Sequence, residues 1–211
     1  MKKDFSLYLV TDEQACLGNN FFQVIEEAIL GGVTVIQLRE KDLPTGEFIA
    51  KALKVKEITS KYNIPLLIND RIDVALATDA DGVHIGQKDM PYALVKRLLP
   101  ENSIIGLSVE SQENVIEAEH FDLDYIAVSP LFNTFTKNDT AEPWEIAGLE
   151  WVSKNSRHPV VVIGGLNDKN ASMAMTHGAS GIAVVSAICS QESPRAAAKT
   201  LFNIIHNQHN L

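Results

Sequence analysis

Residues 174–184 read AMTHGASGIAV, which is the end of a helical pattern, a turn of small residues and then an apolar strand. The same layout occurs in residues 28–36 (AILGGVTVI), 77–85 (ATDADGVHI) and 118–128 (AEHFDLDYIAV). Each of these stretches leads into an even-numbered apolar run of the chain. A closed eight-fold barrel permits a repeat every two strand–helix units, and an open sheet does so less naturally. The repeat therefore predicts a closed barrel, with a doubly wound open sheet as the alternative.

Short apolar runs rich in β-branched residues alternate with longer stretches of helical spacing along the chain. The runs are residues 7–11, 33–38, 65–68, 82–85, 103–107, 125–128, 160–163 and 181–184. Helical spacing covers residues 21–30, 46–62, 91–98, 112–119, 170–177 and 194–206. Such alternation implies parallel strands joined by right-handed crossovers. Because no linker or composition break interrupts it, we expect one α/β domain, a single (β/α)8 TIM barrel over residues 1–211.

The composition narrows the class of partner. The chain has 18 basic and 27 acidic residues, a net charge of −9, and no basic run, which disfavours binding to nucleic acid or to an anionic membrane. No apolar stretch approaches the roughly 18 residues of a membrane span, and the N-terminus lacks a signal-peptide pattern. Cys16 and Cys189 lie outside any C-x-x-C pair and are expected to be free thiols. These features predict a cytoplasmic protein acting on small molecules, and they are compatible with a homo-oligomer.

The candidate site residues directly follow the apolar runs, because barrel active sites lie at the carboxyl ends of the strands. All eight ends are polar or glycine-rich. They carry Thr11 and Asp12; Gln37, Arg39 and Lys41; Asn69, Asp70 and Arg71; Gly86, Gln87 and Asp89; Ser108; Thr134, Thr136 and Lys137 within 129–148; Gly164 and Gly165; and Val185 and Ser186. Loops are polar in most proteins, so position alone is a weak indication.

Asp70 and Asp89 follow neighbouring strands and have two readings. Two carboxylates, completed by ligand oxygens and waters, suit octahedral Mg²⁺. Alternatively, Asp70 caps a helix beginning at Arg71 and Asp89 caps one beginning near Pro91, since aspartate is a preferred N-cap. The residues themselves favour neither reading.

Three cations and a glycine pair point to phosphate groups. Arg39, Lys41 and Lys137 could neutralise a pyrophosphate, although each alone also fits a solvated surface cation. Lys137 lies in a segment of roughly 20 residues, long enough to suggest a lid. Glycines after the seventh run and Ser186 after the eighth favour a phosphate cradle over a plain strand-to-helix turn. His84, inside a strand, is expected to be a hydrogen-bonded core histidine rather than a catalytic base.

Seven short strings occur in order at these strand ends. They are QLREK at 37–41, INDR at 68–71, DGVHIGQKD at 81–89, Gly106-x-Ser108, Pro130-x-Phe132-x-Thr134-x-Thr136-Lys137, Gly164-Gly165 and VSAI at 185–188. Each string alone is weak, but together and in this order they are highly specific. From about residue 7 to residue 188 the chain resembles the thiamine phosphate synthase family.

The resemblance implies a reaction and a set of roles. A hydroxymethylpyrimidine pyrophosphate would lose pyrophosphate to give a stabilised pyrimidine methyl cation, which the nitrogen of a thiazole phosphate then attacks. Asp70 and Asp89 would bind one Mg²⁺ per subunit. Gln37 would contact the pyrimidine, and Ser108 would hydrogen-bond near the departing oxygens. The pyrophosphate would be held by Arg39, Lys41, Asn69 and Lys137, and the thiazole phosphate by Thr134, Thr136, Gly165, Val185 and Ser186. By this comparison Ser108, Lys137 and Arg39 are the expected catalytic residues.

Three positions depart from the expected pattern. Ser129 stands where glycine is expected, Asn133 where proline is expected, and Glu110 where a histidine or small residue is expected. These changes bear on the geometry of the lid and on rate, and they leave every charged site residue in place.

Other functions on the same fold fit less well. A related thiazole tautomerase does not need the metal pair or the Asn-Asp-Arg string, and this chain keeps both. A ligand-binding regulator should have lost Asp70, Asp89 or Lys137. A sugar-phosphate isomerase or aldolase rests on fold analogy alone, and no strand interior holds the lysine that a Schiff-base aldolase needs.

Overall fold

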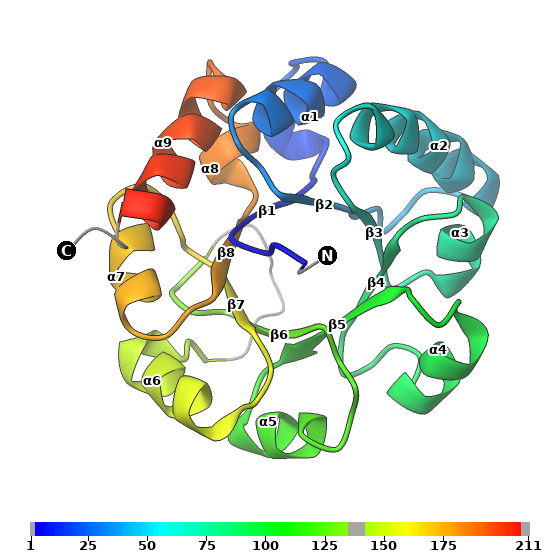
Figure 1. The fold of residues 1–211 in the computed structure, drawn as a ribbon. Helices are drawn as coiled ribbons and strands as arrows, with labels where there is room; N and C mark the ends of the chain where they lie inside the picture. Colours follow the sequence, from blue (N-terminus) through cyan, green and yellow to red (C-terminus); the bar gives the residue numbers. More distant parts are fainter. Residues whose placement is uncertain (1–2, 135–141, 208–211) are drawn as a thin grey trace.

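The computed structural model describes residues 3–134 and 142–207. Its strands form a closed parallel barrel in the order β1 to β8, with β8 hydrogen-bonded back to β1. Figure 1 shows the barrel along its axis, with the helices around the outside. The predicted TIM barrel is confirmed and the open sheet is wrong. The strands are β1 Leu7–Val10, β2 Val35–Leu38, β3 Leu66–Asn69, β4 Gly82–Ile85, β5 Ile104–Val109, β6 Tyr125–Val128, β7 Val160–Ile163 and β8 Gly181–Val184.

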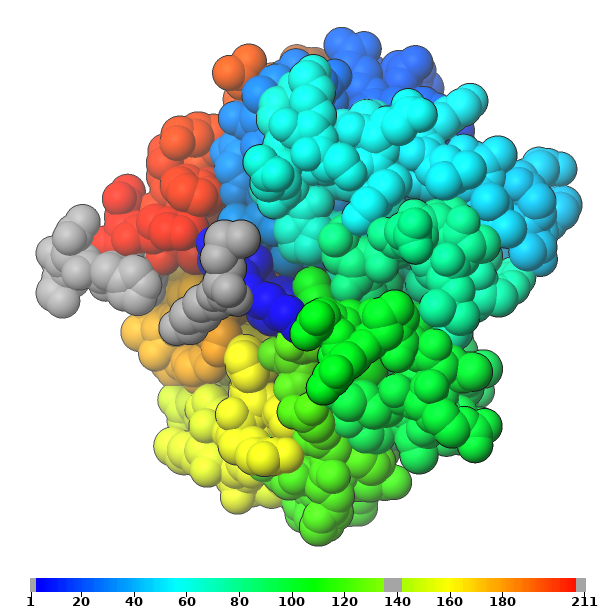
Figure 2. All heavy atoms as spheres, turned by 45° about the vertical axis from the view of Figure 1, so that its right-hand side comes forward, coloured from blue at the N-terminus to red at the C-terminus, as the bar shows by residue number. Residues whose placement is uncertain are grey.

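Six of the helices match the stretches of helical spacing found in the sequence. The helices are η1 Gln14–Cys16, α1 Phe21–Leu30, α2 Thr45–Lys61, α3 Ile72–Ala77, α4 Tyr92–Leu98, α5 Gln112–Ala118, α6 Glu145–Asn155, α7 Ala171–Thr176, α8 Ser186–Cys189 and α9 Pro194–His206. The four outside those stretches are η1, α3, α6 and α8. Of these, α6 begins inside the stretch 129–148 that was expected to be a loop, and α8 spans only four residues directly after β8. In Figure 2 the segments coloured cyan to green, from α2 to α4, form the outer surface on one side of the barrel.

Two layers of apolar side chains hold the barrel together. The larger layer lies between strands and helices, and includes Leu38, Ile68 and Val128. The smaller layer fills the barrel interior with Phe5, Tyr8, Val35, Leu67, Tyr125, Val161 and neighbouring residues. Because the interior is filled, ligands can bind only at an edge of the barrel, and barrel active sites lie at the carboxyl edge of the strands.

Two sequence-based expectations concern the rest of the chain. Cys16 and Cys189 are free and buried, as predicted. Among the residues that the structure describes, no helix is long and apolar enough to cross a membrane.

Candidate active site

The residues that follow β2 alternate between the site and the helix layer. Gln37, Arg39 and Lys41 line a cavity of about 140 Å³ at the carboxyl edge of the barrel. Glu40 faces the other way and forms an ion pair with Lys51 on α2. In extended backbone successive side chains point to opposite faces, so this alternation confirms that Gln37 and Arg39 point the same way.

Asp70 and Asp89 lie together at the ends of the paired strands β3 and β4, and neither caps a helix. The N-cap residues of α3 and α4 are Arg71 and Pro91, and neither N-cap side chain accepts a capping hydrogen bond. The backbone of Asp70 is left-handed, with φ 61°. Lys41 Nζ donates to Asp70 Oδ2 at 2.5 Å, and the backbone nitrogen of Gly86 donates to Asp89 Oδ2 at 2.7 Å. The N-cap reading of both aspartates is therefore wrong.

The two carboxyl groups perturb each other. Burial, then the hydrogen bond to Asp70, raises the pKa of Asp89 above its ordinary value. Burial also opposes ionisation of Asp70, but the hydrogen bonds from Asp89 and Lys41 outweigh it and lower the pKa of Asp70. Such a split is what two close carboxylates produce when they compete for one charge. A divalent cation between them would remove the competition.

Asn69 adds an unsatisfied donor to this cavity. Its side chain is buried, with 7% exposed, and its Nδ2 has no hydrogen-bond partner among the described residues. A buried donor left unpaired costs about 1–3 kcal/mol. Asn69 Nδ2 is therefore available to an oxygen-rich ligand in the same cavity as Lys41 and Arg39.

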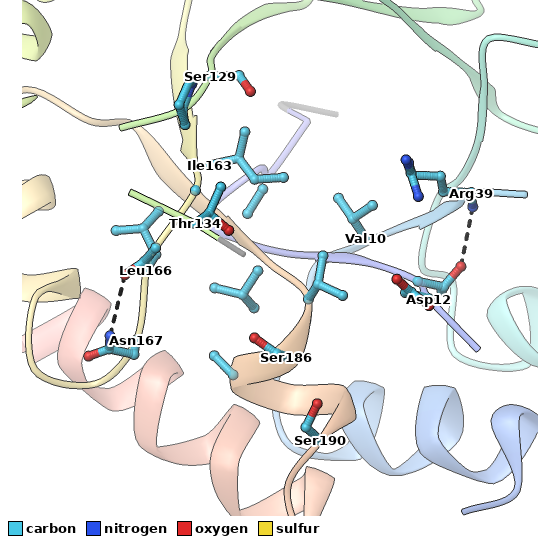
Figure 3. Close-up of a pocket in the computed structure, with 18 of the residues that line it drawn as sticks. Val10, Asp12, Arg39, Ser129, Thr134, Ile163, Leu166, Asn167, Ser186 and Ser190 are labelled. Atoms are coloured by element: carbon cyan, nitrogen blue, oxygen red, sulfur yellow. Dashed lines mark hydrogen bonds between the residues drawn. The ribbon is translucent and has the colours of Figure 1, made fainter. Parts of the chain in front are cut away.

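A second, larger cavity of about 420 Å³ opens beside β7 and β8. It is lined by Thr134, Gly164, Gly165, Val185 and Ser186, together with Ser190 and Asn167. In Figure 3, Ser186 at the beginning of α8 and Ser190 directly after α8 lie on one side of the cavity, and Arg39 lies across it from Thr134 and Leu166. This volume lies within the roughly 300–1,000 Å³ typical of small-molecule sites.

The glycine pair after β7 has a packing role as well. Gly164 and Gly165 have φ values of 106° and 65°. A Cβ at Gly164 would lie 2.7 Å from the Cβ of Pro130, and one at Gly165 would lie 2.6 Å from the carbonyl oxygen of Asn133. Both glycines thus allow the segment after β6 to pack closely against the turn after β7, so the turn does more than connect two elements.

The two cavities share a wall. Val10, Arg39, Ser129, Ile163 and Ala183 line both of them. Apart from Arg39 and Ser129, this wall is apolar. Two ligands, one in each cavity, would therefore meet at a boundary that has few polar groups to bind water.

The structure brings the sequence-predicted site residues to one edge of the barrel. Gln37, Arg39, Lys41, Asn69, Asp70, Asp89 and Ser108 line the smaller cavity, and Thr134, Gly165, Val185 and Ser186 line the larger one. Thr136 and Lys137 lie outside the described residues, as does the middle of the expected lid, residues 135–141. Of the departures from the expected pattern, Ser129 lines both cavities, Asn133 the larger and Glu110 the smaller.

Among the residues of the smaller cavity that the sequence did not predict are two tyrosines. Tyr8 and Tyr125 are buried inside the barrel, and their hydroxyl groups are 2.9 Å apart. His84 is buried and is hydrogen-bonded to the Tyr125 hydroxyl. The prediction of a hydrogen-bonded core histidine at position 84 is therefore confirmed. The available signal was the parity of Tyr8 and Tyr125 within their strands, which points both rings into the barrel.

This fold and site define a class: an enzyme of the TIM-barrel type with two adjoining cavities at the carboxyl edge of its strands. A family model described as thiamine monophosphate synthase matches residues 7–188. The chain is 44% identical to the thiamine-phosphate synthase of Clostridium novyi, over 97% of this chain and 100% of that protein. It is 48% identical to that of Albidiferax ferrireducens, over 94% of this chain and 91% of the other. A solved structure of thiamine phosphate pyrophosphorylase from Pyrococcus furiosus superposes with a TM-score of 0.89 at 36% identity, covering 98% of each chain. The chain belongs to the thiamine monophosphate synthase family.

Proposed function

We propose that the protein joins hydroxymethylpyrimidine pyrophosphate to thiazole phosphate, forming thiamine phosphate and releasing pyrophosphate. This is a transferase reaction of thiamine biosynthesis. The observation that carries the proposal is the pair of cavities with a shared wall. One cavity gathers carboxylates and cations and the other gathers hydroxyls and glycines, so each suits a different phosphorylated substrate.

The smaller cavity suits the pyrophosphate end of the first substrate. Arg39 offers a fork for two oxygens and Lys41 a point charge, and Asn69 contributes its unpaired Nδ2. Its small volume matches a subsite for phosphate groups better than one for two whole substrates. The net charge of −9 makes this local gathering of donors necessary for an anionic ligand.

Asp70 and Asp89 suit one Mg²⁺. Both line the smaller cavity and each shifts the pKa of the other, and Mg²⁺ usually takes one or two carboxylates and completes its shell with phosphate oxygens and water. Among the described residues no group of three or more His, Cys, Asp or Glu side chains could hold a metal ion. When bound, the metal would supply charge stabilisation to the departing pyrophosphate.

The larger cavity suits the thiazole phosphate. Hydroxyl groups of Thr134 and Ser186 and backbone N–H groups near Gly165 and Val185 are the proposed phosphate donors. Thr136 is kept as a proposed ligand on the family resemblance. With the phosphate held beside β7 and β8, the thiazole ring would extend toward the wall shared with the smaller cavity.

The chemistry needs no strong base at this wall. The carbon–oxygen bond to pyrophosphate breaks, and its electron pair leaves with the pyrophosphate. The thiazole nitrogen then donates its lone pair to the methylene carbon, forming the carbon–nitrogen bond. Arg39 and Lys41, with Lys137 by resemblance, stabilise the developing negative charge, and Ser108 hydrogen-bonds to the departing oxygens. Val10, Ile163 and Ala183 keep water from the cation.

The test is product formation from the two purified substrates, with Mg²⁺ and then with EDTA, for the wild type and for Asp89→Ala. We expect thiamine phosphate only with the metal, and at least about a hundredfold less in the variant. Asp73→Ala is the matched control, because Asp73 pairs with Arg71 at the surface and lines neither cavity. Absence of product from the wild type with fresh Mg²⁺ would overturn the proposed reaction.

A further inference from the structure

Five polar side chains form one continuous hydrogen-bonded chain inside the barrel. Gln37 Nε2 lies 2.7 Å from Tyr8 Oη, which lies 2.9 Å from Tyr125 Oη. Tyr125 Oη lies 2.8 Å from His84 Nδ1, and His84 Nε2 lies 2.8 Å from Ser108 Oγ. The chain crosses β2, β1, β6, β4 and β5, and joins two residues proposed to touch the pyrimidine substrate through three that are not.

Each hydroxyl group has only one proton to donate, and this determines which group donates in each hydrogen bond of the chain. The Gln37 amide nitrogen only donates, so Tyr8 Oη accepts from it. Tyr125 is the remaining hydrogen-bond partner of Tyr8 Oη among the described side chains, and either hydroxyl could donate between them. We assign Tyr8 as the donor, because its proton would otherwise be buried without an acceptor. The proton of Tyr125 goes in turn to His84 Nδ1. His84 therefore carries its proton on Nε2 and donates to Ser108 Oγ, which leaves the Ser108 proton directed elsewhere.

The barrel is built to hold the centre of this chain. Tyr125 is fully buried, with 0% exposed, and faces Gly106 across the β5–β6 pairing. A Cβ at Gly106 would lie 2.1 Å from Cζ of the Tyr125 ring, so the ring occupies the space that a side chain at 106 would take. The Tyr125 ring also stacks on His84, with ring centroids 5.6 Å apart. The absence of a side chain at 106 thus fixes where the Tyr125 hydroxyl lies.

Ser108 is the point where the chain reaches the ligand. It is half-buried and lines the smaller cavity beside Asp70 and Asp89. A serine that accepts from a histidine keeps its own proton available as a donor. Negative charge develops on the departing pyrophosphate oxygens, and a donor fixed in advance stabilises such charge without reorganising during the reaction.

We propose that Tyr8, Tyr125 and His84 are positioning residues that fix the histidine tautomer, so that Ser108 donates its proton into the pyrophosphate cavity. In the same hydrogen-bonded chain, the amide nitrogen of Gln37 donates to Tyr8. The carbonyl oxygen of the Gln37 side chain is then left to accept from the amino group of the pyrimidine. The proposal rests on the proposed site roles of Ser108 and Gln37, and adds three residues that act through them.

The hydrogen-bonded chain holds the Ser108 hydroxyl in place as a donor, and it does not transfer a proton to the leaving group. Burial raises the pKa of Tyr125 well above its ordinary value, and burial likewise raises that of Tyr8. Neither phenol gives up its proton near neutral pH. Pyrophosphate therefore leaves hydrogen-bonded to Ser108, without a proton passed along the chain.

The first experiment reads the tautomer directly. Nitrogen-15 NMR of histidine-labelled protein, without substrates, should show His84 protonated on Nε2 in the wild type. In Tyr125→Phe, Nδ1 loses its donor and a population protonated on Nδ1 should appear. A wild-type His84 protonated on Nδ1 would mean that the chain runs in the opposite direction, and would overturn the proposal whether or not the protein makes thiamine phosphate.

The second experiment separates binding from rate. Tyr125→Phe should lower kcat about tenfold to a hundredfold, with KM for thiazole phosphate unchanged. Tyr8→Phe keeps the Tyr125–His84 contact but frees the Gln37 amide, so it should mainly raise KM for the pyrimidine pyrophosphate. Tyr62→Phe is the matched control, because its hydroxyl donates to Glu26 at the surface. If Tyr125→Phe folds, as circular dichroism reports, and keeps wild-type kcat, the positioning role is wrong.

Discussion

Asp70 and Asp89 follow the neighbouring strands β3 and β4 and line the same cavity, where each carboxyl group shifts the pKa of the other. Two carboxyl groups this close cannot both carry full charge unless a cation lies near them. Lys41 supplies part of that charge from one side, through Asp70. We therefore expect a divalent cation bound at this pair to stabilise the fold.

The first prediction concerns this stabilisation. Mg²⁺ with inorganic pyrophosphate, at about one hundred times Kd, should stabilise the wild type by ~2.7 kcal/mol. For a chain of this length that corresponds to a rise in Tm of roughly 5 to 10 °C. Thermal melts of the double variant Asp70→Asn/Asp89→Asn should show no such rise, whereas Asp73→Asn should behave like the wild type. An equal rise in the double variant would place the metal elsewhere.

The second prediction concerns the turn after β7. Gly164→Ala introduces a Cβ at φ 106° and 2.7 Å from Pro130 Cβ, so it should cost about 1–3 kcal/mol in the free energy of unfolding. It should also raise KM for thiazole phosphate, because the turn lines the larger cavity. Gly46→Ala, in the first turn of α2 with open space around it, should stabilise by up to about 1 kcal/mol. Urea unfolding of both variants distinguishes strain at Gly164 from a general effect of added alanine.

The fold could be predicted because strands buried on both faces are apolar on consecutive residues, as in residues 160–163. Four helices could not be predicted in this way. η1, α3 and α8 span only three, six and four residues, and α6 begins at Glu145 inside a stretch that was expected to be a loop. Periodicity needs several turns before it indicates a helix.

The direction of a site residue could be predicted where it depends on one strand alone. Parity within residues 37–41 placed Gln37 and Arg39 on one side. The two readings of Asp70 and Asp89 stayed open because an N-cap and a metal ligand differ only in backbone geometry, here the left-handed backbone of Asp70. The chain from Gln37 to Ser108 could not be predicted, because its members come from five strands and meet only in the closed barrel.

The third prediction concerns Glu110, which stands where a histidine or small residue is expected. Glu110 lines the smaller cavity as its third carboxyl group, after Asp70 and Asp89, and its negative charge opposes an anionic ligand. Glu110→Gln should lower KM for the pyrimidine pyrophosphate about two- to fivefold, corresponding to less than about 1 kcal/mol for a partly exposed charge. Glu113→Gln, on the exposed face of α5, should leave KM unchanged. An unchanged KM in Glu110→Gln would show that this carboxylate does not sense the ligand.

The fourth prediction concerns the support behind Arg39 and Lys41. Lys51, whose side chain is 11% exposed, pairs with Glu40 and, at 2.6 Å, with Glu13, and lies 4.0 Å from the centre of the Phe21 ring. Lys51→Met leaves the largely buried Glu40 carboxylate without its cation, which should destabilise the fold by about 1–3 kcal/mol. Freed from Lys51, Glu40 also competes for the neighbouring cations, so KM for the pyrimidine pyrophosphate should rise.

The control for this prediction lies on the same helix. Lys54 is exposed on α2, and Lys54→Met should change the stability and KM little. The double variant Lys51→Met/Glu40→Leu removes both members of the pair and should recover most of the lost stability, because an apolar pair avoids the cost of an unpaired buried charge. Urea unfolding of the single and double variants gives the coupling between the two residues. If the double variant is as unstable as the sum of the two single ones, Glu40 is not held by Lys51, and the alternation along residues 37–41 must have another cause.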